Sequence, residues 1–268
     1  MTMIIDIHTH IFPDKIAEAV LAYLEAEIGL PGRALGTEND LRDHIAGSGT
    51  DLAVVLGVAT EARLVKKTND WLLAKRDDRF QLFGAIHPDF EDWPQELERL
   101  KKEGVRGIKI NCLTQKIRPD DPKMYPIYEK AASEGLVILF HAGGSFKNRG
   151  NPGEVLGSPE RIAKVLDAFP GMKVIAAHFG GNQVLEQMKI HLLGREVYFD
   201  TSYPPDLWNL APEEVLSIIR AHGVDRMLFG TDYPWETQTR CLQYIRSLPL
   251  TEEEKQKILG ENARRLLS

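Results

Sequence analysis

The sequence predicts a single (β/α)8 barrel, an α/β fold in which parallel strands alternate with helices and close on themselves. The chain has 268 residues, about the usual length of one such barrel. Short apolar, β-branched segments alternate with longer amphipathic segments along the whole chain. Most of the short segments are continuously apolar, as expected of parallel strands that are covered on both faces.

Eight short segments fit buried parallel strands: Ile4–Ile7, Leu52–Val58, Phe80–Ile86, Val105–Ile110, Leu136–Phe140, Lys173–Ala177, Val197–Asp200 and Arg226–Phe229. The intervening patterns predict helices over Pro13–Ile28, Glu61–Lys75, Trp93–Glu103, Pro122–Glu134, Ser158–Phe169, Asn182–Leu193, Pro212–Ala221, Thr237–Leu248 and Thr251–Leu259. Proline in the first turn of a helix costs nothing, because that N–H has no partner within the helix.

Such a pattern also fits an open, doubly wound sheet. That fold needs a GxGxxG turn after the first strand, whereas this strand runs into His8-Thr9-His10. The barrel is therefore favoured. The glycine-rich segment Gly143–Gly157 follows the fifth strand and is expected to form a mobile lid. No linker or repeat interrupts the pattern, so we expect one domain over residues 1–268.

Composition excludes several classes of partner. The net charge is −6, and the sequence has no cluster of Lys and Arg. Both observations disfavour nucleic acid as a partner. The two cysteines, Cys112 and Cys241, are far apart and predict neither a disulfide framework nor a thiolate metal site. We expect no signal peptide, because no basic region followed by an apolar stretch begins the sequence, and no apolar run reaches the length of a membrane helix. We expect a cytoplasmic enzyme with a small-molecule substrate, and a homodimer is left open.

Polar residues follow several predicted strands. They are His8, His10, His141, His178 and Asp232. Because the active sites of barrel enzymes lie at the C-terminal ends of the strands, these side chains are expected at the mouth. Alternation along a strand places His8 and His10 on the same face. Imidazole nitrogens with one carboxylate suit zinc or a similar divalent ion, so the five together predict a metal centre.

The same residues resemble the amidohydrolase superfamily, and in particular its amidohydrolase-related branch with aminocarboxymuconate semialdehyde and resorcylate decarboxylases. The matching phrases are Asp6–Pro13 (DIHTHIFP), Gly107–Lys109 (GIK), His178–Gly181 (HFGG), Gly230–Trp235 (GTDYPW) and Gly260–Leu267 (GENARRLL). The resemblance implies one divalent metal, zinc or manganese, held by His8, His10, His141 and Asp232. It also implies that His178 acts as a base or electrostatic partner and that Asp232 is catalytic.

Lys109 stands where binuclear members carry a carboxylated lysine that bridges two metals. We expect one metal and interpret Lys109 as a contact for a substrate carboxylate. Further residues near strand ends or in the Gly143–Gly157 segment are candidates for substrate binding: Asn111, Arg149, Tyr203 and Trp235.

Three functions are compatible with this site. Hydrolysis of an ester, lactone or amide carbonyl by metal-activated water is favoured, because the chain lacks an obvious long insertion. Non-oxidative decarboxylation of an aromatic or muconate-like acid is the alternative. A barrel that binds a metal or ligand without turnover is the alternative from another class.

Overall fold

The computed structural model describes residues 3–148, 153–203 and 206–268. Eight strands form one parallel sheet in the order of the sequence. They are β1 (Ile5–Thr9), β2 (Leu52–Leu56), β3 (Phe80–Ala85), β4 (Gly107–Ile110), β5 (Val137–Phe140), β6 (Val174–Ala176), β7 (Tyr198–Asp200) and β8 (Met227–Leu228). The predicted barrel and each of its eight strands are confirmed.

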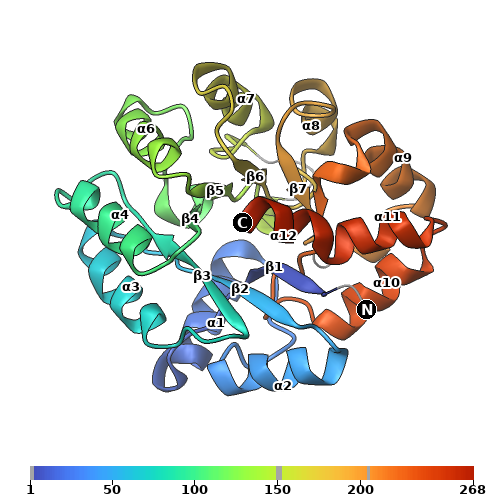
Figure 1. Cartoon of the computed structure of the whole chain (residues 1–268), viewed down its shortest axis with the longest axis horizontal. Coiled ribbons are helices and arrows are strands. Elements are labelled where there is room, and N and C mark those ends of the chain that lie inside the picture. The colour runs from blue at the N-terminus through green and yellow to red at the C-terminus, as the bar shows by residue number, and fades with distance from the viewer. Residues whose placement is uncertain (1–2, 149–152, 204–205) are drawn as a thin grey trace.

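The sheet closes between its first and last strands. The backbone N–H of Ile7 donates to the carbonyl of Phe229 over 2.9 Å, and Thr9 pairs with Tyr233 in a parallel bridge. In Figure 1 the strands lie at the centre and the helices surround them. Closure brings the ends of β1 and β8 together, and with them the histidine pair and Asp232.

The described residues form twelve α-helices: α1 (Asp14–Ile28), α2 (Glu38–Ser48), α3 (Val65–Leu73), α4 (Trp93–Lys102), α5 (Cys112–Gln115), α6 (Tyr125–Ser133), α7 (Pro159–Ala168), α8 (Leu185–His191), α9 (Pro212–His222), α10 (Gln238–Ser247), α11 (Glu252–Gln256) and α12 (Asn262–Leu267). A π-helical segment, Lys257–Glu261, joins the last two. Within the described residues, no helix has the length and apolarity needed to span a membrane.

The barrel interior is packed with apolar side chains. The strands contribute Ile5, Ile7, Val54, Leu56, Phe83, Val137, Leu139, Ile175 and Leu228, and Ala177 follows β6 directly. Ala263 and Leu266 of α12 join this cluster, and α12 lies across the centre of the strands in Figure 1. The barrel interior is therefore filled by apolar side chains toward the N-terminal ends of the strands, and polar residues are placed at the C-terminal ends.

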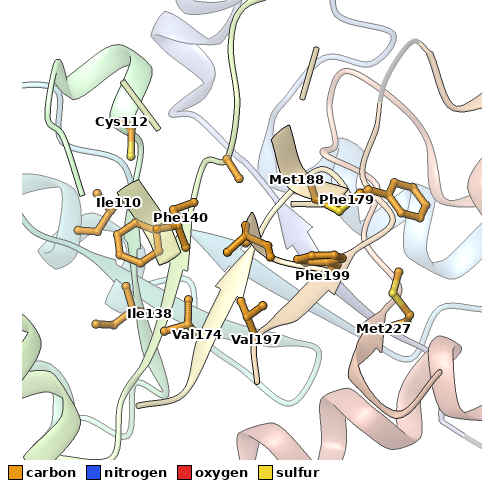
Figure 2. Close-up of a cluster of buried hydrophobic side chains, with 14 of the residues drawn as sticks. Ile110, Cys112, Ile138, Phe140, Val174, Phe179, Met188, Val197, Phe199 and Met227 are labelled. Atoms are coloured by element: carbon orange, nitrogen blue, oxygen red, sulfur yellow. The ribbon is translucent and has the colours of Figure 1, made fainter. Parts of the chain in front are cut away.

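A second core fills the space between the outer face of the sheet and the helices. Figure 2 shows part of it, with Ile138, Phe140 and Phe199 from the strands and Met188 from α8. Alternate residues of β5 and β6 point inward and outward. Both faces of these strands are buried, which explains why the sequence has continuous apolar runs.

Several details differ from the sequence prediction. Helix α2 was not predicted, and α8 is shorter than the predicted Asn182–Leu193. His222, the last residue of α9, is fully buried. Its ring stacks on Phe199, Nε2 lies 2.8 Å from the carbonyl of Val197, and Nδ1 accepts from Gly194 N–H. Two hydrogen bonds and a stacked ring offset the cost of burying this imidazole.

Candidate active site at the barrel mouth

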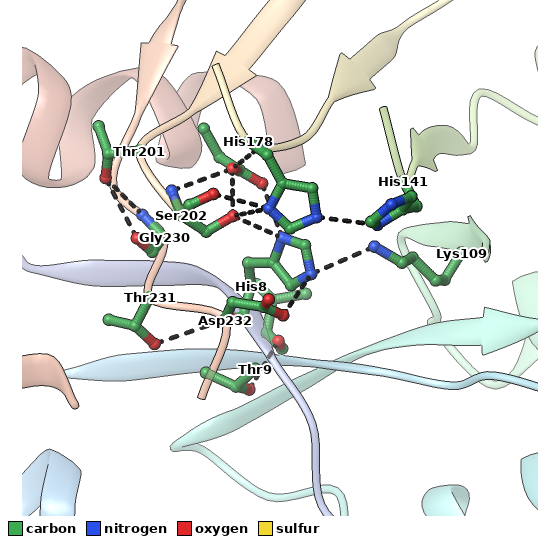
Figure 3. A network of polar contacts seen from close by, with 12 residues as sticks. His8, Thr9, Lys109, His141, His178, Thr201, Ser202, Gly230, Thr231 and Asp232 are labelled. Atoms are coloured by element: carbon green, nitrogen blue, oxygen red, sulfur yellow. Dashed lines mark hydrogen bonds and ion pairs between the residues drawn. The ribbon is translucent and has the colours of Figure 1, made fainter. Parts of the chain in front are cut away.

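The polar residues expected at the mouth do gather there. His8 belongs to β1 and Lys109 to β4, while His141 follows β5 directly. His178 lies two residues beyond β6, and Asp232 follows β8. Both His178 and Asp232 adopt left-handed backbone conformations, with φ of 60° and 58°. Figure 3 shows the side chains of these five residues converging from different strands.

His8 is hydrogen-bonded through Nδ1 to Asp200, the last residue of β7. Nδ1 of His8 lies 2.8 Å from Oδ2 of Asp200, and both residues are buried. A carboxylate oxygen accepts hydrogen bonds, so we assign the imidazole proton to Nδ1. Burial, followed by the charge of Lys109, lowers the pKa of His8 well below its usual value. His8 is therefore a neutral imidazole whose Nε2 carries a lone pair.

His10 has the same protonation pattern. Its Nδ1 lies 3.3 Å from the carbonyl oxygen of Leu56, which only accepts. Burial lowers the pKa of His10, so Nε2 of this neutral ring also carries a lone pair. The ring centroids of His8 and His10 are 5.3 Å apart. The pairing register of β1 with β2 shifts between Asp6 and Thr9, in the same stretch as this approach of the two rings.

Asp232 faces both of these nitrogens. Its Oδ1 lies 3.2 Å from Nε2 of His8 and 3.5 Å from Nε2 of His10. Burial raises the pKa of Asp232, but hydrogen bonds and positive charge in the cluster outweigh it and hold this pKa below the usual range. An anionic oxygen thus faces two lone pairs with no proton between them. This donor set fits a divalent cation.

Lys109 approaches the same point. Its Nζ lies 3.2 Å from Nε2 of His8, and the side chain is buried. Burial lowers the pKa of Lys109 to about 8. An ammonium at this position donates to the lone pair of His8, which agrees with the proton assignment above.

His141 and His178 contact each other on the other side of the cluster. Nδ1 of His141 lies 3.0 Å from Nε2 of His178. Nε2 of His141 is buried and has no hydrogen-bond partner among the described residues. A buried polar atom without a partner is costly, so this nitrogen is available to a ligand. By distance alone, donor atoms of His8, His178 and Asp232 lie within 4.8 Å of one another.

The remaining candidates lie in different surroundings. The side chain of Asn111 accepts from Thr114 N–H and caps α5. The hydroxyl of Tyr203 accepts from Gln183 N–H over 3.2 Å. The ring of Trp235 lies 5.7 Å from that of His10, and its buried N–H has no partner within the described chain. Arg149 lies outside the described residues.

Access to the cluster is narrow. His8, His10, Lys109 and His178 are buried, whereas the side chain of Asp232 is 15% exposed. An open cleft at the loops after β4 and β5 is lined by residues that include Leu113, Lys116, Arg118, Ser145 and Lys147. None of the residues that converge in Figure 3 lines it. Asp232 and His141 are partly exposed, so the cluster meets the mouth at these two residues.

Sequence reasoning did not single out Asp200 and Ser202. Asp200 was recognised only as the end of the strand Val197–Asp200, although a carboxylate at that edge is subject to the same rule that identified Asp232. Ser202 carried no signal of its own, because serine is common in loops after strands.

A parallel eight-stranded barrel with imidazoles, a lysine and carboxylates gathered at the C-terminal ends of its strands has the architecture of a barrel enzyme. A family model described as amidohydrolase matches residues 5–268. The chain belongs to this amidohydrolase family, as its motifs indicated.

Curated relatives are decarboxylases. The chain is 23% identical over 244 residues to gamma-resorcylate decarboxylase of Polaromonas sp. strain JS666, and the match covers 75% of each chain. It is 24% identical over 247 residues to gamma-resorcylate decarboxylase of Rhizobium radiobacter, covering 76% of this chain and 75% of the relative.

Solved structures agree on the fold. 5-Carboxyvanillate decarboxylase from Sphingomonas paucimobilis superposes with a TM-score of 0.76 at 19% identity, covering 100% of this chain and 99% of that one. Dihydroxybenzoic acid decarboxylase from Polaromonas sp. JS666, with bound manganese and the inhibitor 2-nitroresorcinol, gives a TM-score of 0.75 at 18% identity. That match covers 100% of this chain and 97% of the other.

The expectation of ester, lactone or amide hydrolysis is wrong. It depended on the absence of a long insertion, which was taken to separate this chain from decarboxylases. The matches to decarboxylase structures cover 97 to 99% of those chains, so compactness does not distinguish the two reactions. The relatives named above are decarboxylases, which favours the alternative reaction.

Proposed function

We propose that this protein is a metal-dependent, non-oxidative decarboxylase of a small aromatic or muconate-like acid. The observation that carries the metal-dependent part is the approach of Asp232 Oδ1 to Nε2 of His8 and of His10, at 3.2 and 3.5 Å. The choice of decarboxylation is supported by the activities of the relatives, which act on aromatic acids.

We assign the metal ligands to His8, His10, His141 and Asp232. The distance criterion selects His178 instead of His141, but the hydrogen bonds favour His141. Both ring nitrogens of His178 are engaged, Nδ1 by the carbonyl of Ser202 at 2.6 Å and Nε2 by His141. His141 keeps a buried nitrogen without a partner among the described residues, as a ligand needs.

A divalent ion held there would supply positive charge that binds and orients an anionic substrate. Nitrogen and carboxylate donors serve both zinc and manganese, and the related structure with bound manganese favours testing that ion first. We propose one ion per chain. Lys109 donates to His8 as an ammonium, so we assign it to the carboxylate of the substrate and not to a bridge between two metals.

The reaction breaks the bond between a ring carbon and the carboxylate carbon. Carbon dioxide leaves, the bonding electron pair stays on the ring carbon, and a proton takes the vacated position. We assign the relay of that proton, taken up from solvent at the mouth, to a carboxylate oxygen of Asp232, because this side chain is 15% exposed. His178 is its electrostatic partner, because donor atoms of the two side chains lie within 4.8 Å of each other.

Substrate contacts would come from groups whose polar atoms are free for them. We propose Trp235, whose buried N–H has no partner in the described structure, and Lys109. Asn111 and Tyr203 already bond within the fold, so we propose that they shape the wall of the pocket. We retain Arg149 as a proposed contact for an anionic substrate.

The test is release of carbon dioxide from aromatic acids by the manganese-loaded protein. 2,6-Dihydroxybenzoate and 5-carboxyvanillate, which are named for the related enzymes, are the first substrates. Metal-dependent carbon dioxide release from either one that is lost in Asp232→Asn supports the proposal. A protein that binds manganese but releases no carbon dioxide across a panel of hydroxybenzoates and muconates would favour the barrel that binds without turnover.

A further inference from the structure

The end of β7 contacts two imidazoles of the cluster at once. Oδ2 of Asp200 lies 2.8 Å from Nδ1 of His8, and the carbonyl oxygen of Ser202 lies 2.6 Å from Nδ1 of His178. The hydroxyl of Ser202 lies between the two rings, 3.1 Å from His8 Nδ1 and 3.0 Å from His178 Nδ1 (Figure 3). Asp200 and Ser202 are fully buried.

The carboxylate of Asp200 has a fixed orientation. Its Oδ1 accepts three hydrogen bonds, from His178 N–H at 2.9 Å, Ser202 N–H at 3.1 Å and the Ser202 hydroxyl at 2.5 Å. Oδ2 is therefore the oxygen that faces His8. Because this oxygen accepts, His8 carries its proton on Nδ1 and presents a bare Nε2 to Asp232 and Lys109.

The same segment acts on His141 through His178. A carbonyl oxygen has no hydrogen to donate, so the Ser202 carbonyl requires the proton of a neutral His178 to be on Nδ1. Nε2 of His178 then accepts from His141 Nδ1. The proton of His141 is thereby fixed on Nδ1, and its buried Nε2 is left bare.

We propose that the segment Asp200–Ser202 is a positioning device that sets the tautomers of His8, directly, and of His141, through His178. Both rings then present Nε2 to the same ion. The inference rests on the proposed metal site and adds residues that do not touch the ion. Partners of this kind fix ring orientation and tautomer, and their loss typically weakens metal binding about 10- to 100-fold.

The substitution Asp200→Asn tests the direct effect of Asp200 on the tautomer of His8, with little change in the shape of the side chain. The amide oxygen has to remain with the three donors that face Oδ1. The amide NH2 then faces His8 and requires Nδ1 to accept, which moves the proton of His8 to Nε2. Asp14→Asn is the matched control, because it makes the same exchange of a carboxylate for an amide at an exposed position in α1.

The first readout is nitrogen NMR of metal-free protein labelled at histidine, with resonances assigned from single histidine variants. The expected result is an Nδ1–H tautomer for His8, His141 and His178 in the wild type, with an Nε2–H tautomer for His8 in Asp200→Asn. Asp14→Asn should keep the wild-type pattern. An Nε2–H tautomer of His8 or His141 in the wild type would overturn the inference without any variant.

The second readout is calorimetric titration with manganese chloride. We expect manganese affinity to be about 10- to 100-fold weaker for Asp200→Asn and within about threefold of wild type for Asp14→Asn. Wild-type affinity in Asp200→Asn, with manganese bound in both, would contradict the inference alone. Failure of the wild type to bind manganese would contradict the proposed metal site. The tautomers measured by NMR would still decide whether the segment Asp200–Ser202 positions the imidazole rings.

Discussion

Nε2 of His8 lies 3.2 Å from Oδ1 of Asp232, and the surrounding hydrogen bonds leave both atoms without a proton. Two acceptors at hydrogen-bond distance repel each other unless positive charge lies between or beside them. In the structure that charge is the ammonium of Lys109, 3.2 Å from the same nitrogen. The pair therefore defines a cation site at the barrel mouth. The proposed function depends on whether a divalent metal ion binds there.

Replacing Lys109 with methionine should separate its role from that of the metal ligands. The variant keeps the length of the side chain but removes a buried cation beside His8. We expect manganese affinity to be retained or increased, and KM for a carboxylated substrate to rise about 10- to 100-fold, the usual effect of losing a hydrogen bond between charged groups. Calorimetry and steady-state kinetics measure the two effects. A loss of one of two bound ions would instead identify Lys109 as a bridging ligand.

Trp235→Phe should lower activity without lowering stability. The indole N–H is buried and makes no hydrogen bond with described residues, so its removal breaks no contact within the fold. If it donates to substrate, kcat/KM should fall about 3- to 10-fold, as expected for one neutral hydrogen bond. Unchanged kcat/KM with an unchanged melting temperature would remove Trp235 from the substrate site.

His222 should make stability depend on pH in a window away from the active site. Burial lowers its pKa from 6.5 to about 4, because the proton would be added at Nδ1, which already accepts from Gly194 N–H. Between these values the unfolded chain binds a proton that the folded chain does not, so stability should fall as pH decreases from 6.5 to 4.

The loss attributable to His222 is on the order of 1–3 kcal/mol, and it should disappear in His222→Gln. Urea unfolding of both proteins across this range measures it. His191, which is half-buried, supplies the control: His191→Gln should keep the pH dependence of the wild type. Parallel curves of unfolding free energy against pH for wild type and His222→Gln would show that His222 does not cause the pH dependence.

The backbone after His141 should tolerate no side chain at Gly143. Its φ is 101°, and a Cβ there would lie 2.2 Å from the carbonyl oxygen of Asn182. We expect Gly143→Ala to destabilise the fold by at least about 2 kcal/mol and to weaken manganese binding by displacing His141. Gly47→Ala is the control, since a Cβ at this position in α2 meets nothing within 4 Å and should stabilise slightly. Denaturant unfolding that gives equal stabilities for the two variants would contradict this account of Gly143.

The strands and the convergence at the mouth could be predicted from sequence because both follow from local pattern. Continuous apolar runs identify doubly covered strands, and a polar residue at the end of such a run lies at the mouth. Helix α2 was missed because its burial is limited to Leu41 and Ile45, although Thr37 caps it in the manner expected of an N-cap.

Side-chain partners across the barrel could not be predicted in this way. Asp200 and His8 are 192 residues apart, and nothing in either local sequence links them. The burial of His222 depends on acceptors and an aromatic ring supplied by distant segments. The direction of His178 depends on consecutive left-handed residues, His178 and Phe179, a conformation that residue type does not indicate.

Metal content and carbon dioxide release, measured together on the same samples, test the central claim most directly. Wild type, Asp232→Asn and His141→Gln would be stripped with a chelator, reloaded with manganese and assayed with 2,6-dihydroxybenzoate and 5-carboxyvanillate. We expect about one manganese ion per wild-type chain and carbon dioxide release only after reloading. Both the bound ion and the carbon dioxide release should be lost in the two variants. Undiminished carbon dioxide release by the stripped wild type, or full manganese binding by both variants, would contradict the central claim.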